Sequence, residues 1–332
     1  MATNPNSSTN PSAPDGLVDS TASDVTTLAV QGKEITGLDI FSKTADDTAI
    51  PMARVEELMA QMHADIPSGG TDIQYGPTAS QRLRLWTPQS STDKAPIIVY
   101  IHGGSWRVGT YLDSIGATKV SHLTNLGYAF ATVDYTLFPS VSVAAQVQEV
   151  ADAVGHLVRS AGNLNIDPDR VVLMGHSSGA HVATLLGTDT RYLSNAGVPI
   201  TTIHGVVALD GSNYNAPAEI LDSPGPVAEN MLYALGRDLA GLEAMSPTCN
   251  AQAPNARAFL LLHVCRQGDV RQAVEFVNVL RAAGSEAVLR VFEGEGFEGH
   301  VRLLLRLGDP GDAATGVLEG WLKTHVPVAR SV

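Results

Sequence analysis

The sequence predicts an α/β fold in which a mostly parallel sheet is covered by helices on both faces. Three observations indicate this fold. Apolar segments of strand length alternate with segments of helical periodicity through most of the chain. The strand segments are almost continuously apolar, which is typical of strands that are buried on both faces. Near the middle, Gly175-His176-Ser177-Ser178-Gly179 separates one such strand from a helical segment.

Length and composition set the outer bounds. A chain of 332 residues with 44% apolar residues can bury a sizeable core. The net charge of -13 argues against nucleic acid and anionic membranes as partners. Only two cysteines, Cys249 and Cys265, make a disulfide framework improbable and favour a reducing, cytoplasmic location. We expect no membrane span and no secretory signal, because neither a bilayer-length apolar run nor a basic start followed by an apolar core is present.

The first part of the chain divides into three segments. Residues 1–30 are rich in Ser, Thr, Asn and Pro, a composition that predicts a disordered tail. Residues 31–70 form an arm, in which residues 52–66 have helical spacing and are expected to lie on the main domain as part of a cap. Residues 72–86 alternate around Gly76-Pro77 and predict a hairpin that opens the catalytic domain, residues 71–330.

The remaining elements follow in alternation. Because ligands bind at the carboxyl ends of parallel strands, the loops that follow the strands are the candidate sites. The expected strands are 97–101, 128–133, 171–174, 205–209, 259–263 and 287–292, and the expected helices are 115–126, 141–158, 180–186, 272–283 and 313–325.

The G-x-S-x-G segment has the context of a nucleophile elbow. A strand, a sharp turn and a helix would leave Ser177 at the tip of the turn with its hydroxyl exposed. Gly175 and Gly179 lack a Cβ atom, which lets the strand and the helix cross closely. The amide of Ser178, at the start of the helix, would face developing negative charge. The alternative is a Gly/Ser turn without chemistry.

The loop His102-Gly103-Gly104-Ser105-Trp106 follows an earlier strand. Adjacent glycines allow two amides to turn toward one point, as an oxyanion requires, although a flexible turn is the alternative. Trp106 either lines the pocket or faces the core.

Ser177 requires an imidazole to accept its proton. Among the ten histidines, only His300 lies on a late loop after a strand, and we expect it to be the base. Asp269, in the loop after strand 259–263, is the candidate acid, with a solvated carboxylate or a helix N-cap as the alternatives. The order Ser177, Asp269, His300 is the order that α/β-hydrolases use.

From about residue 73 onward the chain resembles an α/β-hydrolase, in the esterase branch that includes kynurenine formamidases and hormone-sensitive-lipase-like carboxylesterases. Its H-G-G-x-W motif is matched by His102, Gly103, Gly104 and Trp106, and its G-H-S-x-G-A-H elbow begins at Gly175. The resemblance implies a small cap, for which residues 212–245 are the candidate, and oxyanion donors at Gly103, Gly104 and Ser178. Without gaps, Cys265 falls at the family aspartate, and a short deletion is needed to place Asp269 there.

The predicted activity is hydrolysis of a small carboxylic ester, or of an activated amide such as an arylformamide, through an acyl-enzyme on Ser177. An acyltransferase using the same serine and a non-catalytic binding protein are the alternatives. We expect no metal and no cofactor, because the sequence contains no cluster with ligand spacing. The sequence does not indicate the oligomeric state. The candidate pocket residues are Trp106, His176, Asn213 and Tyr214, of which the two in the insertion either contact substrate or cap a helix.

Overall fold

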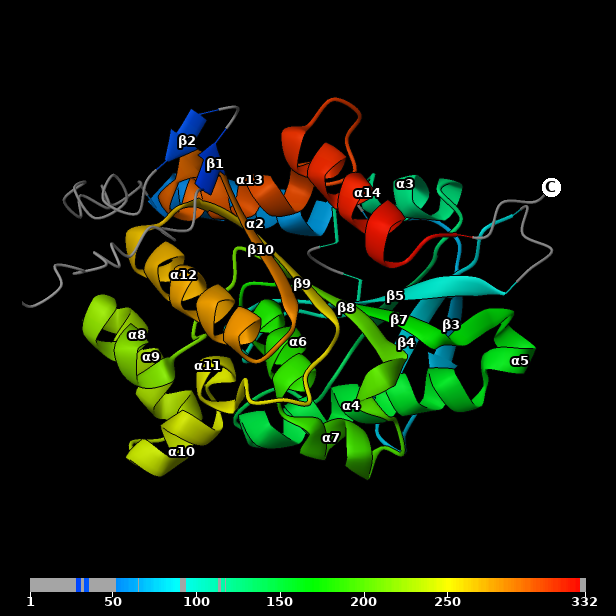
Figure 1. Ribbon diagram of the computed structural model, residues 1–332, viewed down its shortest axis with the longest axis horizontal. Coiled ribbons are helices and arrows are strands. Elements are labelled where there is room, and N and C mark those ends of the chain that lie inside the picture. Colours follow the sequence, from blue (N-terminus) through cyan, green and yellow to red (C-terminus); the bar gives the residue numbers. More distant parts are fainter. Residues whose placement is uncertain are drawn as a thin grey trace, which may run out of the picture.

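The computed structural model describes residues 28–30, 33–35, 52–64, 66–89, 94–112, 115–116 and 118–328. Its centre is an eight-stranded sheet in the order β10-β9-β8-β7-β5-β6-β4-β3 (Figure 1). All neighbours from β10 to β6 are parallel, and β4 is antiparallel to both β6 and β3. The predicted α/β fold with a mostly parallel sheet is therefore confirmed.

The strands agree with the predicted ones in number and place. The hairpin expected over 72–86 is present as β3 and β4, and the last two strands extend beyond their predicted ends. The sheet consists of β3 (Thr71–Gln74), β4 (Arg82–Trp86), β5 (Ala95–Ile101), β6 (Ala129–Val133), β7 (Ile166–His176), β8 (Ile203–Leu209), β9 (Ala258–Cys265) and β10 (Glu286–Glu295).

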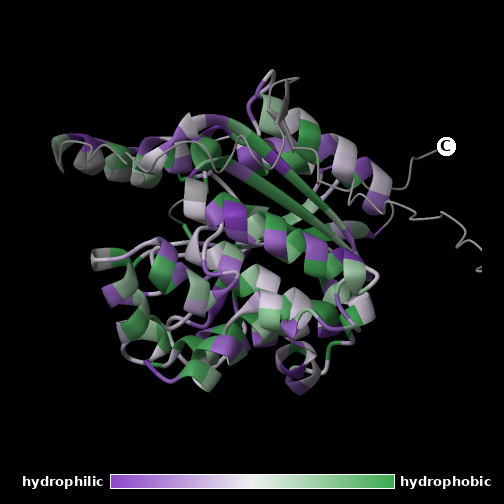
Figure 2. Cartoon of the chain, turned by 60° about the vertical axis from the view of Figure 1, so that its left-hand side comes forward, coloured by the Kyte–Doolittle hydropathy of each residue, from purple (hydrophilic) through white to green (hydrophobic). Residues whose placement is uncertain are grey.

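Helices cover both faces of this sheet, and the apolar alternation of the strands explains why. Along β5, Ile97, Val99 and Ile101 belong to one core cluster, whereas Ile98 and Tyr100 belong to the other. The first cluster is closed by α4 (Val143–Arg159), α6 (Ser178–Thr188) and α12 (Gln267–Ala282), and the second by α3 (Lys119–Asn125), α13 (Gly296–Arg306) and α14 (Ala313–His325) (Figure 1). Coloured by hydropathy, the strands form a green layer between helices that carry purple residues (Figure 2).

The N-terminal arm reaches the helix that follows the last strand. Its helix α2 (Met52–Ala64) lies within the predicted range and is tied to α13 by an ion pair of 2.6 Å between Arg54 and Glu298. Residues 1–27 of the expected disordered tail lie outside the described residues. Leu28–Val30 form β1, which pairs with β2 (Lys33–Ile35).

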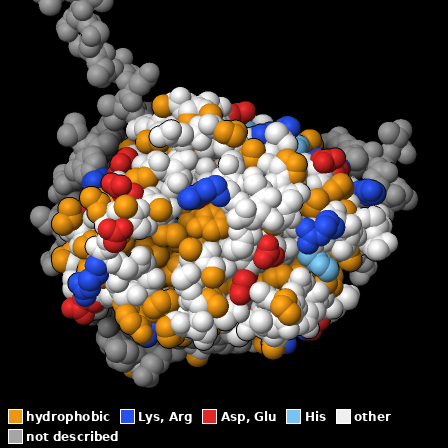
Figure 3. All heavy atoms as spheres, turned by 90° about the horizontal axis from the view of Figure 1, so that it is seen from below, with side chains coloured by type: hydrophobic (Ala, Val, Ile, Leu, Met, Phe, Trp, Pro, Cys, Tyr) orange, Lys and Arg blue, Asp and Glu red, His pale blue; other side chains and the backbone are white. Residues whose placement is uncertain are grey.

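The segment between β8 and β9 forms an insertion of short helices at one end of the sheet (Figure 1). Met231 and Leu242 of this insertion are buried in the first core cluster. Other large apolar side chains remain more than half exposed, namely Leu221, Val227, Tyr233 and Leu239. The view from below shows hydrophobic side chains at the surface among charged ones (Figure 3). The helices are α8 (Ala216–Asp222), α9 (Pro226–Leu235), α10 (Leu239–Ala244) and α11 (Pro247–Asn250), while α5 (Ala161–Leu164) and α7 (Thr190–Asn195) lie outside it.

Candidate active site

The register of three neighbouring strands assembles the site. His176 of β7 pairs with Leu209 of β8, and Leu209 pairs with Leu262 of β9. The three residues that come next are Ser177, Asp210 and His263, so they stand in one row at the carboxyl edge of the sheet. A serine, an aspartate and a histidine are thus brought together by backbone pairing alone.

Ser177 has the backbone conformation of an elbow. Its φ of 56° and ψ of -124° are unfavourable for a residue with a side chain, and such strain persists only where the surroundings impose it. Here the surroundings are tight: a Cβ atom at Gly175 would collide with the carbonyl of Gly179, and one at Gly179 with the carbonyl of Ile101. The predicted close crossing of strand and helix is present.

The glycine loop after β5 lies against the elbow. A Cβ atom at Gly103 would come within 3.0 Å of the Cβ of Ser177, and Gly104 has a φ of 115°. The amide of Trp106 donates to the hydroxyl of Ser178 over 3.3 Å, which ties this loop to the first turn of α6. Gly103 is therefore next to Ser177, and the glycine loop is held against the start of α6.

His102, the first residue of the glycine loop, packs against Tyr135. The ring of His102 stacks on Tyr135 with centroids 4.4 Å apart, and the Tyr135 hydroxyl donates to the His102 carbonyl over 2.9 Å. His102 thus supports the loop as a packed side chain.

His300 lies in α13 and not on a loop, which corrects the prediction. Strand β10 continues to Glu295, and α13 begins at Gly296, so His300 is in the second turn of this helix. Its ring centroid is 4.2 Å from that of His176, and a hydrogen bond of 3.1 Å joins His176 Nε2 to the His300 carbonyl. His176 therefore donates through Nε2 and holds His300 beside the elbow. Burial, and next the neighbouring His300, keep the pKa of His176 well below its ordinary value.

Asp210, and not Asp269, contacts His300. The Oδ2 atom of Asp210 is 2.6 Å from Nδ1 of His300, and Asp210 is completely buried. Because a carboxylate only accepts, Nδ1 carries the proton and Nε2 is left with a lone pair. Asp269 is instead in the first turn of α12, buried, with its carboxylate 2.8 Å from Arg266. The sequence assignment of the acid was wrong, because β9 runs to Cys265 and α12 begins two residues later.

Four donors surround the Asp210 carboxylate. Its Oδ1 accepts from the amide of Val264 over 3.1 Å and lies 3.3 Å from Nδ1 of His263. Its Oδ2 accepts from Arg266 over 2.8 Å as well as from His300. Burial alone would raise the pKa of Asp210, but the Arg266 cation and the hydrogen bonds from His263 and His300 outweigh it and hold that pKa well below its ordinary value. Asp210 is therefore ionised throughout the neutral range.

The predicted pocket residues of the insertion face inward. Tyr214 is fully buried, stacks on Phe276 with centroids 5.2 Å apart, and its hydroxyl is 3.0 Å from Nε2 of His263. Tyr214 thus packs between Phe276 and His263. Asn213 is also buried, with a φ of 62°, and its amide group donates to Ser212 over 2.8 Å. The helix cap of α8 is Asn215, whose side chain accepts from the amide of Ala218.

Trp106 faces the core, which is one of the two alternatives that the sequence left open. It is buried in the first core cluster, with its ring 5.4 Å from that of His181 in an edge-on arrangement. Burial lowers the pKa of His181 to about 4, so both side chains of this pair are neutral packing groups.

Sequence reasoning missed Asp210, although a signal was available. Asp210 follows a buried strand directly, and that strand is the neighbour of the elbow strand in the sheet.

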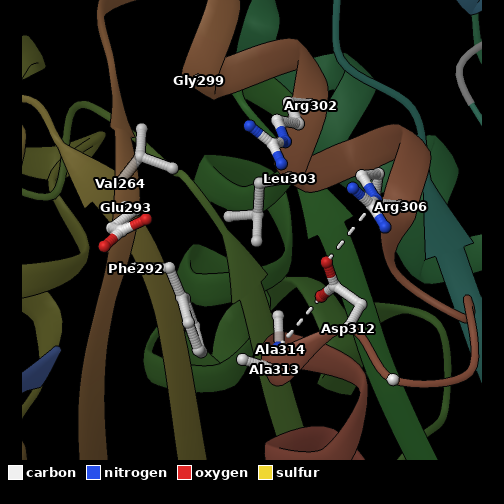
Figure 4. Close-up of a pocket in the computed structure, with 11 residues that line it drawn as sticks. Val264, Phe292, Glu293, Gly299, Arg302, Leu303, Arg306, Asp312, Ala313 and Ala314 are labelled. Carbon is white, nitrogen blue, oxygen red and sulfur yellow. Dashed lines mark hydrogen bonds and ion pairs between the residues drawn. The ribbon is translucent and has the colours of Figure 1, made fainter. Parts of the chain in front are cut away.

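A cavity of about 250 Å³ is bounded by α13, β10 and the start of α14. Arg302 and Arg306 extend into it from α13, and Arg306 is paired with Asp312 (Figure 4). Ser177 is not among the lining residues of this cavity. Within the described part of the chain, no group of three or more His, Cys, Asp or Glu side chains is arranged to hold a metal ion, and no helix is long and apolar enough to cross a membrane.

The sheet order, the elbow and the histidine after the last strand define an α/β-hydrolase. The proteins that the chain resembles are esterases and a formamidase. The BD-FAE family model matches residues 83–208. Esterase B of Lactobacillus rhamnosis shares the fold, with a TM-score of 0.65 at 20% identity over 82% of this chain and 91% of that one.

Three curated proteins are similar to this chain in sequence. A probable isoprenylcysteine alpha-carbonyl methylesterase of Oryza sativa is 25% identical over 67% of this chain and 56% of its own length. Carboxylesterase NlhH of Mycobacterium tuberculosis is 26% identical over 64% of this chain and 69% of its own. The kynurenine formamidase of Danio rerio is 30% identical over 36% of this chain and 40% of its own. The chain therefore spans little more than half of the rice relative.

Proposed function

We propose that this protein is a serine hydrolase of small carboxylic esters, with Ser177 as nucleophile, His300 as base and Asp210 as the acid. The observation that carries the proposal is the 2.6 Å contact between Asp210 and His300 beside a serine held at a φ of 56°. A buried, ionised carboxylate on Nδ1 leaves Nε2 as the proton acceptor, which is what a hydroxyl nucleophile requires.

The reaction has two steps. Ser177 Oγ attacks the ester carbonyl while His300 takes its proton, and the amides of Gly103, Gly104 and Ser178 stabilise the oxyanion. The alcohol leaves with the proton from His300, and a water activated by the same imidazole then releases the acid. Loss of one oxyanion donor typically costs about 3 kcal/mol of barrier.

The insertion between β8 and β9 would act as a cap over this site. Its helix α9 is fastened to the segment that follows the glycine loop: Arg107 donates to Asn230 over 3.1 Å and lies over the Tyr233 ring at 5.2 Å. The cap would therefore bound the substrate pocket from the α9 side.

Hydrolysis of an arylformamide is a second candidate, because the formamidase of Danio rerio is among the relatives. A panel of p-nitrophenyl esters of increasing acyl length, together with N-formyl anilides, would separate the two substrate classes by kcat/KM.

The decisive experiment follows p-nitrophenyl acetate in a stopped-flow instrument. We expect a burst of p-nitrophenol equal to the enzyme concentration, and a mass increase of one acetyl group on Ser177 after an acid quench. Ser177→Ala should abolish both, whereas Ser194→Ala, at an exposed position on α7, should leave both unchanged. A non-catalytic binding protein would give neither signal. An acyltransferase would release acetate only slowly in water and much faster when an alcohol is added.

A further inference from the structure

Arg266 connects the two acids of the site. It precedes α12, and its guanidinium is 2.8 Å from Asp210 through Nη1 and 2.8 Å from Asp269 through Nη2. Asp210 and Asp269 are both buried, while 26% of the Arg266 side-chain surface is accessible to solvent. Asp269 therefore acts as the anchor of a cation that is directed at the acid of the proposed triad.

Arg266 and the base share one oxygen atom. Oδ2 of Asp210 accepts from both Arg266 Nη1 and His300 Nδ1, which are only 3.1 Å apart. Arg266 is always charged, so a second proton on His300 would create an imidazolium beside a fixed guanidinium. Two like charges at such a distance disfavour the protonated imidazole.

We propose that Arg266 is a positioning residue that sets the lower pH limit of catalysis. Through its contact with Asp210 it keeps His300 in the unprotonated, Nδ1–H form, and Asp269 keeps Arg266 in place. This inference rests on the proposed function, since it assumes that His300 is the base.

Among the charged groups around His300, Arg266 lowers its pKa most, and His263 acts in the same direction more weakly. From β7, His176 is neutral because of its own buried position. From β8, Asp210 favours the protonated imidazole, and from β9, His263 lies on the opposite oxygen of Asp210 at 3.3 Å. Within α13, Glu298 is occupied by Arg54 of α2. Burial, and next the Arg266 cation, lower the pKa of His300 despite the hydrogen bond that its Nδ1 donates to Asp210.

The test is the pH profile of kcat/KM for p-nitrophenyl acetate, read at the isosbestic wavelength of p-nitrophenol. The unsubstituted protein should lose activity only below the ordinary imidazole pKa of about 6.5. Arg266→Gln should move this acid limb upward by about one pH unit or more, because the repelling charge is gone. Arg266→Lys keeps the charge, so its acid limb should lie close to that of the unsubstituted protein. Arg302→Gln, at an exposed arginine on the same helix as His300, is the matched control and should leave the limb in place.

A limb that stays in place in Arg266→Gln, or that moves downward, overturns the inference. A second measurement covers the case in which this variant does not fold. In the Ser177→Ala protein, the imidazole nitrogens of His300 can be titrated by NMR, and we expect an Nδ1–H tautomer that protonates below pH 6.5. Protonation at or above that value contradicts the role of Arg266. Failure of the proposed function has a different signature: Ser177→Ala would remain active.

Discussion

The Nδ1 atom of His300 lies 2.6 Å from Oδ2 of Asp210, although ninety residues separate them in the chain. The acid comes from β8, the strand beside the elbow strand, and not from β9, the next strand in the sheet. His263, in β9, and Arg266, just after it, contact the same carboxylate. The two acidic residues therefore have different partners: Asp210 contacts His300, and Asp269 contacts Arg266.

Asp210→Asn should lower kcat by about ten-thousandfold with the fold intact, because an amide stabilises the wrong imidazole tautomer. Asp269→Asn should cost less than about tenfold, because that side chain contacts Arg266 and not His300. Initial rates for both variants, with thermal midpoints as the control for folding, decide between the two acids. Equal losses would contradict the assignment of Asp210.

The elbow strain can be measured. Ser177→Ala and Ser177→Gly should both lose more than about a thousandfold of activity. Glycine tolerates a φ of 56°, so Ser177→Gly should be at least as stable as Ser177→Ala, although glycine elsewhere costs about 1 kcal/mol relative to alanine. Urea unfolding of the two variants gives the comparison, and a glycine variant that is clearly less stable would argue against strain at this position.

Gly179→Ala should destabilise the protein, because the added methyl group meets the backbone of Ile101 and His102. In an unobstructed helix the same change stabilises by up to about 1 kcal/mol. Gly316→Ala and Gly320→Ala in α14, where a Cβ atom has open space, are the matched controls and should raise the thermal midpoint. The same sign for all three variants would mean that strand and helix do not cross closely at the elbow.

Stability should depend on pH through Lys119. This side chain is fully buried and donates to the carbonyl of Leu304 over 2.8 Å, and burial lowers its pKa to about 7. Between pH 7 and the unfolded pKa of about 10.4, the unfolded chain binds more protons, so the free energy of unfolding should rise with pH. Lys119→Met should flatten this rise, while Lys323→Met, at an exposed lysine, should keep it. Denaturant titrations at pH 7, 8.5 and 10 provide the measurement, and an unchanged slope in Lys119→Met would exclude Lys119 as its source.

The sequence by itself determined the class of fold and the position of the elbow. Alternating apolar strands and amphipathic helices require a covered parallel sheet, and Gly175, Ser177 and Gly179 form an elbow because only that spacing of small residues lets strand and helix cross. These features depend on neighbours in the chain, which is why a local pattern reveals them.

The tertiary structure alone decided which acid meets His300 and which polar side chains turn inward. The row formed by Ser177, Asp210 and His263 depends on the register of three strands that lie far apart in sequence. A shift of one residue in that register would direct a different side chain at the imidazole, and no local pattern fixes it. Trp106 and Tyr214 are core residues for the same reason: their burial depends on Phe276, His181 and His263, which come from other elements.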